Sequence, residues 1–144
     1  MALTLEDRLA IQDLFARQNL TYDRRLPEET AAMFTEDGVL ELGGGDLVFT
    51  GRDAIAAYMV RLLEVTGDDY RHWTNSLVIE GDGDEASVEC YLAAFGMNDG
   101  SLRLAGRYFD RLRKVDGGWL FAHRRFESEY SNTGGPDVRA RLPE

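Results

Sequence analysis

The chain has 144 residues, of which 44% are hydrophobic and 29% charged, and its formal net charge is −10 at pH 7. This length and composition fit one globular domain with a single core. The negative charge argues against a nucleic-acid partner and an anionic membrane surface, and the absence of a signal-like start or a long apolar run predicts a cytoplasmic protein.

The first part of the chain reads as two helices. Thr4 and Asp7 have the spacing of a capping box, and apolar residues at helical intervals then predict a helix over residues 5–22. Pro27 is a good first-turn residue and predicts a second, short helix that extends as far as Phe34.

Short strands and a third helix follow. Strands are predicted over residues 39–42 and 47–50, joined by a tight reversal of three glycines at 43–45. The third helix begins at residues 51–53, a Gly-Arg-Asp sequence, and ends at residues 66–69.

From Tyr70 onward the pattern changes to long strands separated by turn sequences. Because three consecutive hairpins form an antiparallel sheet, this part of the chain predicts a four-stranded antiparallel unit. The predicted strands cover residues 70–80, 86–97, 102–115 and 119–129.

Together these elements predict an α+β fold. We expect a cone-shaped, curved antiparallel sheet with three N-terminal helices that cover a pocket. The domain should span residues 1–130, and residues 131–144, which hold two glycines and two prolines, should form a flexible C-terminal arm.

Asp23 and His72 are the residues that best suggest chemistry. One ends the first predicted helix, and the other lies near the start of the first long strand. A carboxylate can orient an imidazole that acts as a general base, although a structural histidine and a solvated aspartate would give the same pattern. The second histidine, His123, has no acidic partner suggested by the sequence. The lone cysteine, Cys90, is interpreted as a small buried hydrophobic side chain.

Several further side chains are candidates for substrate binding. Tyr22 and Tyr108 have hydroxyls that can reach a pocket, and an arginine inside it would stabilise an oxyanion. Arg124 and Arg125 are adjacent on a strand, so only one can point inward, and alternation does not choose between them. Phe34, Met59 and Trp73 are predicted to form an apolar wall. No phosphate-binding loop, calcium loop or metal-ligand spacing is present, and we expect chemistry without metal or cofactor.

Short stretches of the sequence, at residues 22–23, 34–37, 51–55, 72–75, 106–108 and 117–124, together carry a family resemblance. In these stretches the chain resembles a SnoaL-like domain of the nuclear transport factor 2-like superfamily. In that superfamily, scytalone dehydratase, bile-acid dehydratase and hexachlorocyclohexane dehydrochlorinase use an Asp–His dyad for cofactor-free elimination. Asp23 and His72 match the dyad, and Tyr22 matches a tyrosine of the scytalone enzyme, whose second histidine has no counterpart here.

The resemblance implies a dehydratase-like lyase that abstracts a proton from a small, largely apolar organic substrate. Isomerisation or cyclisation of polyketide- or steroid-like substrates would use the same base. A non-catalytic ligand-binding module or an oxygenase accessory subunit has the same fold. The superfamily also implies a homo-oligomer, either a dimer or a trimer. The sequence leaves the substrate open.

Overall fold

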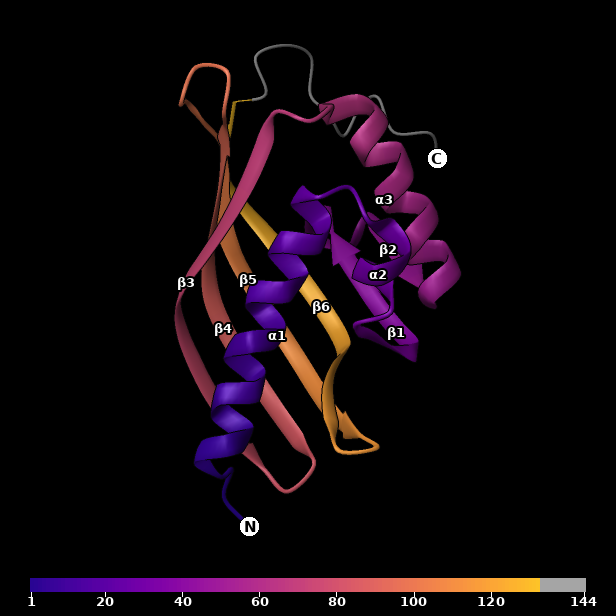
Figure 1. Cartoon of the computed structure of the whole chain (residues 1–144), viewed down its shortest axis with the longest axis vertical. Helices are drawn as coiled ribbons and strands as arrows, with labels where there is room; N and C mark the ends of the chain where they lie inside the picture. The colour runs from indigo at the N-terminus through magenta and orange to yellow at the C-terminus, as the bar shows by residue number, and fades with distance from the viewer. Residues whose placement is uncertain (133–144) are drawn as a thin grey trace.

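The structure is a computed structural model that describes residues 1–132. Three α-helices and six strands make up this part of the chain, and the helices lie on one face of a curved sheet (Figure 1). The α+β class is therefore confirmed. The elements are α1 (Leu5–Asp23), α2 (Pro27–Ala31), β1 (Phe34–Leu42), a 3₁₀ turn (Gly43–Gly45), β2 (Leu47–Thr50), α3 (Arg52–Thr66), β3 (Tyr70–Asp82), β4 (Glu85–Gly96), β5 (Leu102–Val115) and β6 (Gly118–Ser131).

The sheet is mixed and not wholly antiparallel. Its strand order is β2-β1-β6-β5-β4-β3, and β1 runs parallel to β6 while the other neighbours are antiparallel. The expectation of an antiparallel sheet was wrong at this pair. Turn sequences reveal hairpins between consecutive strands, but they carry no information on a strand that pairs with a partner some eighty residues away.

Phe34 belongs to β1, although the sequence placed it in the second helix. The backbone N–H of Phe121 donates to the carbonyl of Met33 at 2.9 Å, which ties this segment to β6 just after α2 ends. Gly38 lies where the strand is irregular, and a Cβ there would approach the Phe34 Cβ to 2.9 Å. Glycine is therefore required where β1 bends over its own first residue.

The N-terminus of α1 is fixed by Asp7. The predicted capping box with Thr4 is present, and the Asp7 carboxylate also accepts hydrogen bonds from Lys114 Nζ at 2.9 Å and Trp119 Nε1 at 3.0 Å. These hydrogen bonds, that of Lys114 above all, hold the pKa of Asp7 well below its usual value. Helix α1 is thereby anchored on β5 and β6, and its other end is directed toward the opposite end of the sheet.

The core lies between α1 and the inner face of the sheet. Phe15 packs edge-on against Phe121 with ring centroids 5.2 Å apart, and Phe34 contacts the same ring. Cys90 is buried in this core, and burial raises the pKa of its thiol to about 12. A thiol of such low acidity is no nucleophile at neutral pH, in keeping with the interpretation as a small hydrophobic side chain.

Candidate active site

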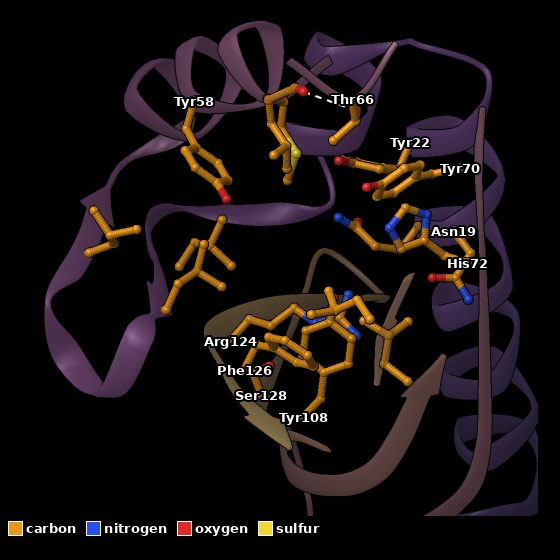
Figure 2. A pocket seen from close by; sticks show the side chains of 18 of the residues that line it. Asn19, Tyr22, Tyr58, Thr66, Tyr70, His72, Tyr108, Arg124, Phe126 and Ser128 are labelled. Atoms are coloured by element: carbon orange, nitrogen blue, oxygen red, sulfur yellow. Dashed lines mark hydrogen bonds between the residues drawn. The ribbon is translucent and has the colours of Figure 1, made fainter. Parts of the chain in front are cut away.

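A cavity of about 580 Å³ lies between the helices and the sheet. Side chains from α1, α3 and every strand contribute to its lining. In Figure 2, Tyr22 and His72 approach it from one side, Tyr58 points in from α3, and Tyr108 and Arg124 lie across from them on the sheet. The lining is mixed: aliphatic and aromatic surface is interrupted by hydroxyls, amides, one imidazole and one guanidinium, as ligand pockets require.

Asp23 and His72 meet at this cavity. The Asp23 Oδ1 atom lies 2.7 Å from His72 Nδ1, and Oδ2 accepts the backbone N–H of His72 at 3.1 Å. Only 9% of the carboxylate side chain and 12% of the imidazole side chain are exposed. Two hydrogen bonds from one residue to one carboxylate fix both the position and the rotation of the ring.

The contact with Asp23 also determines which nitrogen of the His72 ring carries the proton. A carboxylate next to Nδ1 favours the tautomer with hydrogen on that atom, so Nε2 carries the lone pair. His72 lines the cavity, whereas Asp23 lies behind it. The Tyr22 ring stands edge-on to the imidazole with centroids 4.4 Å apart. Asn19 Nδ2 donates to Thr74 Oγ1 at 3.0 Å and joins α1 to β3 next to the pair.

Arg124, not Arg125, is the arginine that faces the cavity. Its Nε lies 3.2 Å from Asp110 Oδ1, and its guanidinium carbon lies 3.5 Å above the ring centroid of Tyr108. Burial raises the pKa of Asp110 to about 7, although Arg124 opposes this shift. Arg125 points to the other face of the sheet, where it contacts Phe109 and pairs with Glu127.

Three tyrosines of the cavity are hydrogen-bond donors at neutral pH. Burial is the main cause that raises the pKa of Tyr22, Tyr58 and Tyr108 above the usual value. Their hydroxyls therefore keep their protons and can donate to an oxygen of a bound molecule.

Of the three residues predicted to form an apolar wall, Phe34 and Met59 line the cavity, whereas Trp73 does not. The Trp73 side chain is 51% exposed and packs against Phe95 on the outer face. Side chains alternate along a strand, so the orientation that turns His72 toward the helices turns its neighbour away.

His123 lies outside the cavity. Its Nε2 atom is 3.0 Å from Glu41 Oε2, a partner on the parallel strand β1. Because that pairing joins distant segments, the sequence did not suggest this acid.

Sequence reasoning missed several lining residues, among them Gln18, Tyr58 and Tyr70. A usable signal existed for Gln18, which precedes Tyr22 by four residues and so shares its helix face. The expected arm from residue 131 falls almost entirely outside the described residues, since Ser131 ends β6.

Across residues 1–132, no three His, Cys, Asp or Glu side chains gather closely enough to hold a metal ion. In the same part of the chain, no helix has the length and apolar character needed to cross a membrane.

A curved sheet of six strands with three helices over one face is the cystatin-like, nuclear transport factor 2-like fold. Within that fold class the sequence model of the SnoaL-like domain matches residues 3–125. The chain belongs to the SnoaL-like domain family.

Solved structures agree with this assignment. A variant of Rv3472, a function unknown protein from Mycobacterium tuberculosis, is 34% identical with a TM-score of 0.81, and the match covers 93% of this chain and 83% of that one. A protein of unknown function from Nostoc punctiforme is 29% identical with a TM-score of 0.83, covering 90% and 96% of the two chains.

A putative scytalone dehydratase from Novosphingobium aromaticivorans is also similar. It is 27% identical with a TM-score of 0.76, and the match covers 90% of this chain and 88% of that one. No curated protein matches the sequence. The family thus includes dehydratase-type relatives next to many proteins without a known function.

Proposed function

We propose that this protein is a cofactor-free, dehydratase-like lyase that acts on a small, largely apolar organic molecule. The observation that carries the proposal is the 2.7 Å contact between Asp23 Oδ1 and His72 Nδ1, on an imidazole that lines the cavity. The resemblance to a putative scytalone dehydratase supports the same class of reaction.

In the proposed reaction, His72 Nε2 removes a proton from a carbon next to a carbonyl group. The C–H electron pair becomes a carbon–carbon double bond, and the bond to a hydroxyl on the next carbon breaks. The departing oxygen takes the proton back from the imidazolium and leaves as water. Asp23 holds the ring in the required tautomer and stabilises the imidazolium between the two transfers.

Negative charge develops on the carbonyl oxygen as the proton is removed, and hydrogen-bond donors or a cation are needed to stabilise it. Tyr22 and Tyr108 have hydroxyls that stay protonated, and Arg124 carries a fixed positive charge at the sheet side of the cavity. We assign these three residues to polarisation of the carbonyl or of the leaving group. Phe34 and Met59 supply apolar contact for the rest of the substrate.

Isomerisation or ring closure would begin with the same proton abstraction, because both reactions pass through the same enolate. The two outcomes differ in product mass: elimination releases one water, whereas isomerisation and cyclisation leave the mass unchanged. A module that only binds its ligand, or that serves an oxygenase, would cause neither change.

The test uses cyclic β-hydroxy ketones, with 3-hydroxycyclohexanone as the first, and follows enone formation by ultraviolet absorbance and mass spectrometry. We expect His72→Gln to reduce turnover by roughly two to four orders of magnitude, the size of a general-base contribution. His123→Gln is the matched control because that imidazole also contacts a carboxylate but lies outside the cavity. Equal turnover in the wild type and His72→Gln would contradict the mechanism.

A further inference from the structure

Gln18 has a buried polar side chain whose oxygen lacks a hydrogen-bond partner. It lies in α1 one turn before Tyr22, lines the cavity, and is only 4% exposed. Its Oε1 atom is buried, and no group among the described residues donates a hydrogen bond to it. Such an atom is unusual, because buried polar groups in folded proteins nearly always have partners.

The side-chain amide of the next residue, Asn19, does have a hydrogen-bond partner. Asn19 also lines the cavity, but its Nδ2 donates to Thr74 Oγ1 at 3.0 Å and links two elements. Gln18 makes no such link with its side chain. Its amide therefore has no part in the hydrogen bonds that join α1 to the sheet, and a bound molecule is the partner that the cavity can supply.

The chemistry of that partner follows from the amide. An amide group accepts through its oxygen and donates through its nitrogen, and a half-turn of the group exchanges the two. It thus suits a hydroxyl or a carbonyl equally, and it carries no charge. Arg124 lies across the cavity, where its Nε is 3.2 Å from Asp110 Oδ1. The neutral Gln18 amide itself suits an uncharged oxygen substituent.

A halogenated or unsubstituted hydrocarbon would fit the same space poorly. Carbon-bound hydrogen and halogen donate no conventional hydrogen bond, so with such a ligand in the cavity the Gln18 oxygen would stay unpaired in either orientation of the amide. A site with buried polar groups discriminates strongly against analogues that leave those groups without partners.

We infer that Gln18 binds an oxygen substituent of the ligand and restricts this protein to oxygenated organic molecules. The hydroxyl or carbonyl it contacts is separate from the carbon that His72 would deprotonate, so Gln18 acts as a specificity-determining residue. The expected selectivity of turnover rests on the proposed function, whereas the expected selectivity of binding does not.

The test compares two probes of similar size, 3-hydroxycyclohexanone and chlorocyclohexane, by NMR titration of the full chain. We expect Gln18→Leu to weaken binding of the hydroxy ketone about 3- to 10-fold, the effect of one neutral hydrogen bond. Binding of chlorocyclohexane should be unchanged or tighter. Gln12→Leu is the matched control, because Gln12 lies on the exposed side of the same helix.

Circular dichroism checks the fold of each variant, and Gln18→Met replaces the leucine variant if that one unfolds. The inference is overturned if the substitution weakens both probes equally or weakens neither. Titrations of His72→Gln separate the two proposals: selective binding without turnover would sustain the role of Gln18 if catalysis were absent. Turnover together with unselective binding would support the lyase proposal and contradict the role of Gln18.

Discussion

Replacement of Asp23 by asparagine tests the link between the carboxylate and the imidazole without a change in side-chain size. Asp23 accepts two hydrogen bonds from His72, one from the ring at 2.7 Å and one from the backbone at 3.1 Å. An asparagine has one oxygen, so its NH₂ group must face one of these two donors. The ring can relieve that conflict if its proton moves from Nδ1 to Nε2, which removes the lone pair from the cavity.

The size of the effect follows from the lost charge. Imidazolium and carboxylate centres in such a contact lie about 4 Å apart, and unit charges at this distance interact by about 4 kcal/mol at an effective dielectric constant of ~20. Because each ~1.4 kcal/mol corresponds to a tenfold change in rate, we expect Asp23→Asn to lower kcat by about three orders of magnitude. The wrong tautomer acts in the same direction.

Two assays measure this variant. Turnover is followed with the cyclic β-hydroxy ketone, and the ¹⁵N shifts of the His72 ring show which nitrogen carries the proton. Glu41→Gln is the matched control, since it removes a carboxylate 3.0 Å from the imidazole of His123 outside the cavity. The reasoning is refuted if Asp23→Asn folds, keeps hydrogen on Nδ1 and retains kcat within threefold of the wild type.

Two further predictions concern buried carboxylates and pH. The pKa of Asp7 is lowered in the fold, so its contribution to stability is present above the unfolded value of ~3.9 and is lost as pH falls through the folded value. Asp7→Asn should lower Tm at pH 7, and thermal melts should show the difference from the wild type shrinking below pH ~4; a constant difference would contradict this. Burial raises the pKa of Asp110 to about 7, so this residue's contribution is complete below pH ~3.9 and is lost as pH rises through about 7. Urea titrations from pH 5 to 8 should show this loss in the wild type and not in Asp110→Asn; identical pH profiles would rule out the raised pKa.

Local features of the fold could be predicted because their causes are local. The capping box of Thr4 and Asp7 and the hairpin turns after β3, β4 and β5 depend on residues close together in sequence. The parallel pairing of β1 with β6 was missed because it depends on how distant segments meet. Phe34 was misplaced for the same reason, since its strand conformation is tied to a hydrogen bond from Phe121 to Met33.

The candidate site divides in a similar way. Family resemblance identified Asp23 and His72 as a pair, and their contact is present in the structure. The alternation rule is sufficient to place Trp73 outside once His72 faces inward, so the prediction of Trp73 as a wall residue conflicted with that of His72 as the base. The orientation of Arg124 could not be predicted from the sequence. Both faces of β6 carry apolar residues, and only the partner Asp110 on β5 distinguishes the two arginines.

The described part of the chain contains two carboxylate–imidazole pairs of similar length, and their comparison shows what a pair needs in order to act. Glu41 and His123 are 3.0 Å apart, with side chains about one quarter exposed, and the imidazole borders a hollow of about 460 Å³ on the outer face, where charged side chains line the surface and solvent weakens the pair. Asp23 and His72 are more deeply buried, and the imidazole lines a cavity. A proton acceptor becomes useful when its free nitrogen faces a bound carbon acid in a dry space, and the carboxylate is then held on the far side of the ring. The deeper burial and the more apolar lining of its cavity, more than the pair itself, therefore distinguish His72 from His123.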